Sequence, residues 1–362
     1  MEFGIFSNGF RPHTTAAATY EEDLREIILA DELGFRDAWI SEHHGEPVYI
    51  DKVDTLSMPE LLMCKAAALT KRIRFGAAIK VIHLQHPVDV AIQLATSDHV
   101  IGNNRFMFGF GSGFPSPQFS VQRGLTFDDR HSRMLESLEL ILKCWSAEAP
   151  FDFEGKHWRG KGIVATPRPL ATPHHMPIAV ATEHDSILEM AAQRGYTLLS
   201  AFLEPARTVR KKGEKYARAA LAAGHTAPLK KISAARMIYV TDSEKQGIEE
   251  LRAAVTFELG FQMKRGFVQL LKGLYGLPFP NDTVTFDELI ASGLYIIGDP
   301  DSVARRLRDF YVESGGFGTL LMVTGKAWAT SEKRARSMRL FMEQVAPQLR
   351  DLEPGAVAAK AA

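Results

Sequence analysis

Apolar residues in this chain follow two periods, which alternate along most of the sequence. Short runs rich in β-branched and aromatic residues are typical of buried strands, and longer stretches with an apolar residue every three or four positions are typical of amphipathic helices. We predict eight strands, each followed by a helix, at residues 2–6, 37–41, 73–81, 105–111, 177–182, 196–202, 232–240 and 318–323. The clearest helical patterns cover residues 17–33, 130–145 and 330–349.

Local signals mark several helix ends. Gly34 follows the first helical pattern at a position where a left-handed residue ends a helix. Ser57 and Glu60 have the spacing of a capping box, which predicts a helix start there. Pro87 stands where the next helix is expected to begin, a position that tolerates proline.

Strands that alternate with helices form parallel sheets, and eight such units predict a single (β/α)8 TIM barrel. A doubly wound open sheet is the alternative, but no GxGxxG follows the first strand. We expect one barrel domain over residues 1–350 and an Ala-rich tail over 351–362. Two segments interrupt the alternation, at about 146–176 and 258–293, and both read as insertions into the barrel.

Composition narrows the class of protein. The chain has 43 Lys plus Arg and 43 Asp plus Glu, which argues against nucleic acid or an anionic membrane as the main partner. Two cysteines exclude a disulfide framework and favour a reducing compartment. We find no signal peptide and no apolar run of spanning length, so we expect a cytoplasmic protein.

Polar residues recur directly after the predicted strands. Glu42, His43 and His44 follow the second strand, and other polar residues follow the first, third, fourth and fifth, namely Asn8, His83, Ser112, Glu183 and His184. In a TIM barrel the carboxyl ends of the strands carry the active site. A single loop histidine is as often simply solvated, but several polar residues at the same end predict a shared cleft.

The adjacent histidines do not favour a metal site. Metal-dependent barrels usually present two imidazoles at alternate positions of a strand, so that both face the lumen. His43 and His44 are neighbours and would face opposite ways in extended backbone, and the chain has no His-x-His. We therefore predict no bound metal.

The chain resembles the bacterial luciferase-like family of flavin-dependent monooxygenases over nearly its full length. The resemblance rests on the order and spacing of "LGFRDAWISEHH", "HP" at 86–87, "RFMFGFGSG", "PIAVATE", "GDPDSV" and "GGFGTLL". Within that family, "GSGFP" and "GGFGT" are similar to the branch of limonene and diketocamphane monooxygenases.

The resemblance implies a two-component monooxygenase. Such an enzyme takes reduced FMN from a separate NAD(P)H:flavin reductase, and O2 adds at flavin C4a to give a peroxyflavin that oxygenates an organic substrate. We expect a small hydrophobic substrate, such as a terpenoid, cyclic ketone or aldehyde-like compound. The family also implies a homodimer.

The resemblance also suggests roles for individual residues. His44 matches a catalytic histidine near the reactive edge of the flavin, and Glu183 matches a glutamate on the flavin side of the fifth strand. The "GAAI" stretch matches a segment with a non-prolyl cis peptide beneath the isoalloxazine, which we place at Ala78–Ile79 or one residue away. An imidazole titrates near neutral pH, so His44 can protonate an oxygenated flavin or hold its anion.

One departure from the family affects the flavin phosphate. The luciferases have an arginine where this chain has Ser112, beside Gly113 at the expected cofactor turn. We consider two replacements. Arg130 and Arg133 open the helix over 130–145, where Asp128 and Asp129 could instead merely offset them. The second replacement is the helix start at His184 and Ser186, because helix N-termini suit phosphate.

The substrate pocket is expected to be apolar. Phe10 and Phe114 lie just after predicted strands, where they could line a pocket or belong to the core, and we add Asn8 and His43 to the same pocket. Three alternatives stay open: a deazaflavin (F420) oxidoreductase on the same fold, a non-catalytic flavin-binding barrel and, last, a metal-dependent hydrolase.

Overall fold

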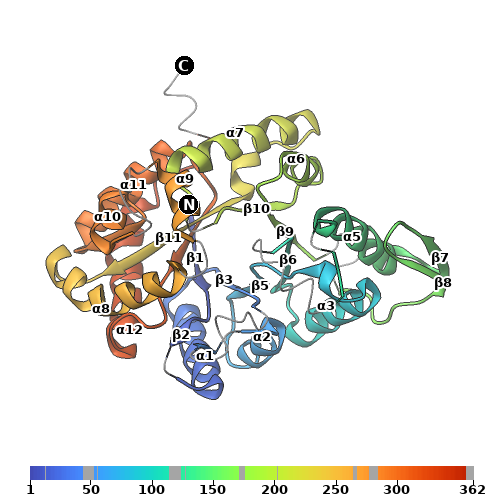
Figure 1. Cartoon of the computed structure of the whole chain (residues 1–362), viewed down its shortest axis with the longest axis horizontal. Helices are drawn as coiled ribbons and strands as arrows, with labels where there is room; N and C mark the ends of the chain where they lie inside the picture. The colour runs from blue at the N-terminus through green and yellow to red at the C-terminus, as the bar shows by residue number, and fades with distance from the viewer. Residues whose placement is uncertain are drawn as a thin grey trace.

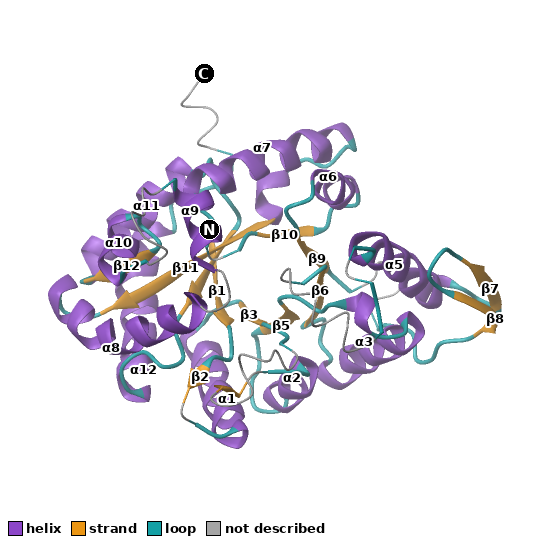
Figure 2. Cartoon of the chain, viewed as in Figure 1, coloured by secondary structure: helices purple, strands orange, loops and turns teal. Residues whose placement is uncertain are grey.

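The computed structural model describes residues 1–12, 14–43, 53–54, 56–113, 124–126, 128–170, 176–201, 203–263, 267–276 and 284–355. Within these ranges eight parallel strands form a closed ring, which confirms the predicted barrel (Figure 2). In order around the ring they are β1 (Glu2–Ser7), β3 (Asp37–Ile40), β5 (Arg74–Ala77), β6 (Phe106–Gly111), β9 (Ile178–Ala181), β10 (Thr197–Leu199), β11 (Ile232–Val240) and β13 (Thr319–Val323). The ring closes where Leu198 of β10 pairs with Ile232 of β11.

Helices surround the ring on its outer side (Figure 1). Those that follow the ring strands are α1 (Ala16–Leu33), α2 (Pro59–Ala67), α3 (Pro87–Ile101), α5 (Arg130–Ser146), α6 (Asp185–Gln193), α7 (Ala206–Ala222), α8 (Glu244–Met263) and α12 (Ser331–Leu340). Gly34 ends α1 with φ 87°, as the sequence predicts, because a glycine adopts that conformation without steric cost.

Strand side chains alternate between two apolar clusters, as the pleat of a β-strand requires. Ala38 and Ile40 of β3 belong to the cluster beneath the helices, whereas Trp39 belongs to a second cluster, which lies inside the barrel and continues into the helices after β11. A Cβ on Gly76 of β5 would lie 2.3 Å from the Trp39 ring, and one on Gly109 of β6 would lie 3.0 Å from it. The two glycines therefore make room for this indole in the barrel.

Two local predictions need correction. The third strand, predicted over 73–81, ends as β5 at Ala77, and a cis peptide bond follows between Ala78 and Ile79. Helix α2 has Met58 as its N-cap, with no side-chain cap hydrogen bond, in place of the predicted capping box of Ser57 and Glu60. Glu60 is buried and forms an ion pair with Lys80, so its carboxylate is not available to cap the helix.

Both predicted insertions contain regular structure. The first carries a hairpin of β7 (Phe151–Glu154) and β8 (Arg159–Ile163), which projects beyond α5 (Figure 1). The second begins inside α8 and continues with α9 (Phe267–Tyr275) and α10 (Phe286–Ala291). It is followed by β12 (Tyr295–Gly298), which the sequence analysis missed and which pairs with the C-terminal half of β11, and by α11 (Pro300–Glu313).

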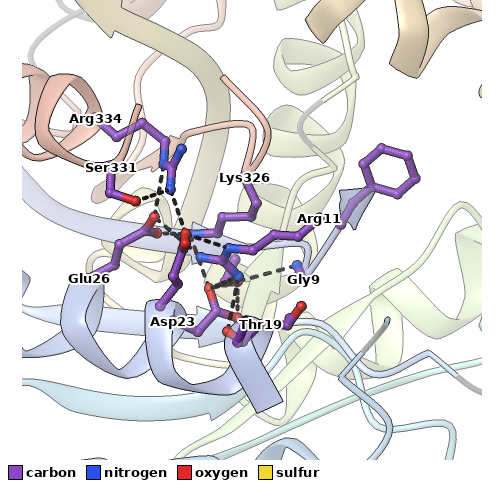
Figure 3. Close-up of polar contacts among 12 residues, drawn as sticks. Gly9, Arg11, Thr19, Asp23, Glu26, Lys326, Ser331 and Arg334 are labelled. Carbon is purple, nitrogen blue, oxygen red and sulfur yellow. Dashed lines mark hydrogen bonds and ion pairs between the residues drawn. The ribbon is translucent and has the colours of Figure 1, made fainter. Parts of the chain in front are cut away.

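A buried ion network joins the loops that follow the first and the last strand of the ring (Figure 3). We call it the seam network. Its cations come from the β1–α1 loop, the β13–α12 loop and α12, its carboxylates come from α1, and its members are Arg11, Glu22, Asp23, Glu26, Lys326 and Arg334. Ser7, at the end of β1, donates to Asp23 at 3.0 Å. Three cations thus balance three carboxylates where the first and last strands of the ring meet.

The described residues contain neither a candidate membrane span nor a candidate metal site. None of their helices is long and apolar enough to cross a membrane. Nor do three or more of their His, Cys, Asp or Glu side chains form a group that could hold a metal ion.

Candidate active site

The carboxyl ends of the ring strands meet at one end of the barrel, and most predicted site residues lie there. Two of them, the predicted catalytic His44 and the pocket residue Phe114, lie outside the described residues. His43 is half-buried, and its backbone N–H donates to the carbonyl oxygen of Leu56 at 3.0 Å. In the β1–α1 loop the N–H of Phe10 donates to Asn8 Oδ1 at 3.2 Å, and the Phe10 side chain is buried.

The peptide bond between Ala78 and Ile79 is cis, at the position that the sequence predicts. Its flanking amides hold it against both neighbouring strands: Ala78 N donates to Ile40 O, and Lys80 N donates to Gly109 O, both at 2.8 Å. Ala78 and Ile79 pack against the apolar cluster inside the barrel. This peptide therefore forms part of the floor at the open end of the barrel.

A buried lysine anchors the start of the Glu-His-His run. Lys80 Nζ lies 3.0 Å from Glu60 Oε1 and 3.3 Å from Glu42 Oε2, and each of the three side chains is at most 2% exposed. Burial opposes the charge on Lys80, but the two carboxylates raise its pKa above the ordinary value. The ion pair thus fixes Glu42, the residue before His43.

The two candidate phosphate sites of the sequence analysis come together in the structure. His131, in the first turn of α5, lies against His184, the N-cap of α6, with ring centroids 5.2 Å apart. Ser186 Oγ lies 3.0 Å from His184 Nδ1. The N-termini of two helices, each of which favours an anion, are therefore adjacent.

Asp129, which precedes α5, forms its ion pair with a lysine of the β7–β8 hairpin and not with the arginines of α5. Asp129 Oδ1 lies 3.2 Å from Lys156 Nζ in the β7–β8 hairpin, so its ion pair is directed away from the helix. Arg133 stacks its guanidinium over the Trp158 ring, 5.3 Å from the centroid, and its buried Nε has no hydrogen-bond partner. The hairpin thus orients this end of α5 through Lys156 and Trp158.

His83 lies near the same residues, and we call His83, Arg130, His131, Arg133 and His184 the cationic cluster. It lies in a short 3₁₀ turn (Ile82–Leu84) that packs against α5, it is 2% exposed, and its Nδ1 has no hydrogen-bond partner. Burial lowers the pKa of His83 to about 4, and nearby Arg133, Arg130 and His131 contribute to the shift. The imidazole is therefore neutral at neutral pH and has a ring nitrogen free for a ligand.

The remaining predicted residues lie around this cluster. Ser112 and Gly113 follow β6, and Gly113 has φ 76°. Glu183 is exposed and forms an ion pair with Lys212 of α7 at 2.7 Å. Lys212 also pairs with the buried Glu204, so the carboxylate of Glu183 is turned toward α7.

Sequence reasoning missed Lys80, Glu60, Lys212 and Glu204 as members of buried ion pairs. Lys80 had a usable signal, since it interrupts the apolar run "GAAIKVI" where a strand was predicted to be buried. A buried lysine needs a carboxylate partner. Its partner Glu60 lies 20 residues away, and spacing gives no clue to it.

Comparisons with known proteins point to the same family as the sequence resemblance. The family model described as luciferase-like monooxygenase matches residues 1–317. The 3,6-diketocamphane 1,6-monooxygenase of Pseudomonas putida is 24% identical, over 96% of this chain and 98% of that protein. The limonene 1,2-monooxygenase of Rhodococcus erythropolis is 25% identical, over 98% of this chain and 88% of that protein.

The solved structures include a similar barrel. The oxygenating constituent of 3,6-diketocamphane monooxygenase from Pseudomonas putida, a type II Baeyer-Villiger monooxygenase in complex with FMN, superposes with a TM-score of 0.81 at 24% identity. The match covers 96% of this chain and 98% of that one. The fold, the matched length and the branch of relatives all agree with the sequence resemblance, and the chain belongs to the luciferase-like monooxygenase family.

Proposed function

We propose that this protein is the oxygenase component of a two-component flavin-dependent monooxygenase. It binds reduced FMN, delivered by a separate NAD(P)H:flavin reductase, and uses O2 to oxygenate a small hydrophobic substrate. The observation that carries the proposal is the cationic cluster, in which two helix N-termini and the buried His83 meet near the strand ends of a luciferase-like barrel. The names of the relatives, which include diketocamphane and limonene monooxygenases, support an apolar terpenoid or cyclic ketone as substrate.

The residues of the cluster fit a phosphate monoester. Arg130 and Arg133 supply charge, His83 supplies a ring nitrogen without a partner, and the first turn of α6 supplies backbone N–H groups together with His184 and Ser186. Charged donors and helix N-termini are the groups that bind phosphate in proteins. This set takes the place of the arginine that the family has at the position of Ser112.

The other half of the site suits a flat ring and an apolar substrate. The cis peptide between Ala78 and Ile79 and the turn of Ser112 and Gly113 would hold the isoalloxazine. FMN, when bound in its reduced form, supplies the electrons that activate O2. The apolar cluster inside the barrel excludes water, and we assign to His44 the holding or transfer of a proton at its imidazole.

The loops that follow the strands would hold the substrate. We assign Asn8, Phe10, His43 and Phe114 to this pocket. A deazaflavin oxidoreductase is the second candidate on the same fold, but a cluster this rich in cations favours the terminal phosphate dianion of FMN. We further propose a homodimer in the cytoplasm, where the free thiols of Cys64 and Cys144 stay reduced.

A comparison of FMN with riboflavin tests the phosphate site. Arg→Ala at the position that holds the phosphate, Arg130 or Arg133, should weaken FMN binding by about 1.5–3 kcal/mol, the range for a charge-assisted hydrogen bond. Riboflavin lacks the phosphate and should lose far less. Lys143→Ala, at the other end of α5, is the matched control and should bind both flavins like the parent. If both arginine variants bind FMN like the parent, the cluster does not hold the phosphate.

Binding of the flavin phosphate should also change the pKa of His83. In the free protein the imidazole should titrate near pH 4, because burial and the neighbouring cations disfavour its charged form. A bound phosphate favours the charged form, so saturating FMN should raise the pKa of His83 by about one unit or more, whereas riboflavin should leave it in place. Histidine-selective NMR titration measures this, with His83→Gln to assign the signal. A pKa near 6.5 in the free protein would contradict the buried, unpartnered imidazole.

A further inference from the structure

A cavity lies on the outer side of the barrel wall and is lined by none of the predicted site residues. Its volume is about 810 Å³, and it lies between β11, β12 and helices α7, α8, α9, α10 and α11. Arg236 of β11 lines it, while the flanking Ala235 and Met237 belong to the cluster inside the barrel. Since successive strand residues face opposite sides, Arg236 points outward into the helix layer.

The guanidinium of Arg236 is buried, and the carboxylate whose charge raises its pKa, that of Glu204, forms its own ion pair with Lys212. Arg236 is 2% exposed, and its guanidinium carbon lies 3.7 Å from the centroid of the Phe310 ring. Nη1 donates to Ala235 O at 3.0 Å, but Nε has no hydrogen-bond partner, and no carboxylate of the described residues forms an ion pair with it. Burial lowers the pKa of Arg236 to about 10, so the group remains a cation at neutral pH.

A second orphaned donor lines the same cavity. The hydroxyl of Tyr275, at the end of α9, is buried and has no hydrogen-bond partner. Burial raises the pKa of Tyr275 to about 12, so this phenol is a neutral donor. Two buried donors without acceptors in one cavity match an acceptor supplied by a ligand, since an unmet buried polar group costs stability.

The other charges around the cavity are paired or lie at its rim. Glu244 pairs with Arg306 at 2.7 Å, and Asp287 pairs with Arg252 at 3.0 Å. Arg207 donates to the carbonyl oxygen of Leu274. Asp309 and Glu313 are exposed. Among the described residues that line the cavity, Arg236 is therefore a buried cation whose guanidinium forms no ion pair.

We propose that this cavity binds a monocarboxylate with an apolar body, whose carboxylate meets Arg236 and Tyr275. A guanidinium and a phenol together satisfy the two oxygens of one carboxylate. One part of the wall is suited to a hydrocarbon or aromatic body, because it is formed by Ile248, Ile290, Tyr295, Ile296 and Phe310. The site is separate from the proposed flavin site and does not depend on it.

Benzoate is the probe, and benzamide is its neutral counterpart. Titration calorimetry should show saturable binding of benzoate to the intact chain, at least tenfold tighter than benzamide, because only the carboxylate pairs with the guanidinium. Inorganic phosphate, which has no apolar body, should bind more weakly than benzoate. Added FMN should not displace benzoate. A chain that shows no saturable benzoate binding, or that binds benzamide equally well, would overturn the proposal.

Three variants locate the site. Arg236→Met should weaken benzoate binding by more than about tenfold, and Tyr275→Phe should weaken it severalfold while disturbing the packing least. Arg305→Met, an exposed arginine on α11 outside the cavity, should bind benzoate like the parent. If Arg236→Met does not fold, the Tyr275→Phe result decides. Unchanged benzoate affinity in Tyr275→Phe, or displacement of benzoate by FMN, would show that the carboxylate binds elsewhere.

Discussion

Replacing His44 with alanine should lower the yield of oxygenated product by about 10²-fold or more, the scale for a lost acid–base group. The change removes an imidazole from the proposed reactive edge but leaves the cationic cluster and the cis peptide in place. Affinity for reduced FMN should therefore change little. In a coupled assay with the reductase, NADH and O2 consumption should continue while hydrogen peroxide replaces the product.

His43→Ala is the matched control, because His43 is the preceding residue of the same run and its backbone is held by Leu56. We expect it to affect substrate binding or packing and to keep most of the product yield. If His44→Ala keeps its yield while His43→Ala loses it, the catalytic role belongs to the other histidine.

The second large effect concerns the stability of the barrel. Glu26→Ala should reduce the free energy of unfolding by about 3–5 kcal/mol, the cost of breaking a buried ion network from one side. Glu26 contacts Arg11, Lys326 and Arg334, so its loss leaves three cations facing two carboxylates where the first and last strands meet (Figure 3). Urea unfolding at neutral pH measures the change.

An exposed ion pair provides the comparison. Asp351 and Arg308 are 2.7 Å apart, with side chains 64% and 40% exposed, and Asp351→Ala should cost about 1 kcal/mol or less. A Glu26→Ala variant that loses no more stability than Asp351→Ala would show that the seam network contributes little to the fold.

The same network predicts a dependence on pH. Burial alone would raise the pKa of Glu26, but Lys326, Arg11 and Arg334 lower it to about 2, from an ordinary value of 4.5. The folded state then holds this proton less tightly than the unfolded chain, so the stabilisation is complete above about pH 4.5 and is lost as the pH falls toward 2. The stability difference between parent and Glu26→Gln should shrink over that range. A difference that stays constant from pH 7 to 3 would contradict the assigned ion pairs.

Periodicity was sufficient to predict the ring of strands. All eight predicted segments became ring strands, because each is an apolar run of strand length followed by a helix with one buried face. The sequence did not predict β12, because Tyr295–Gly298 follows a long insertion and pairs only with Met237–Val240 of β11, past the two residues of β11 that pair with β10. A strand of four residues outside the main alternation has no periodic signal of its own.

The sequence predicted those parts of the site that a short local motif determines. The cis peptide between Ala78 and Ile79 was predicted from a motif, and the clustering of His184 with His131 followed only from the way α5 and α6 pack. The link from Glu42 through Lys80 to Glu60 and the orphaned guanidinium of Arg236 depend on contacts between distant segments. One sequence does not specify such contacts.

An anaerobic titration followed by single-turnover oxidation tests the central claim most directly. We predict that reduced FMN binds much more tightly than oxidised FMN, so that the protein purifies nearly colourless, and that reduced F420 does not compete with it. When O2 is admitted to the loaded protein, a flavin absorbance distinct from both reduced and oxidised FMN should form before oxidised FMN is released. Equal affinity for both redox states of FMN, or preferential binding of reduced F420 without reaction with O2, would contradict a two-component FMN monooxygenase.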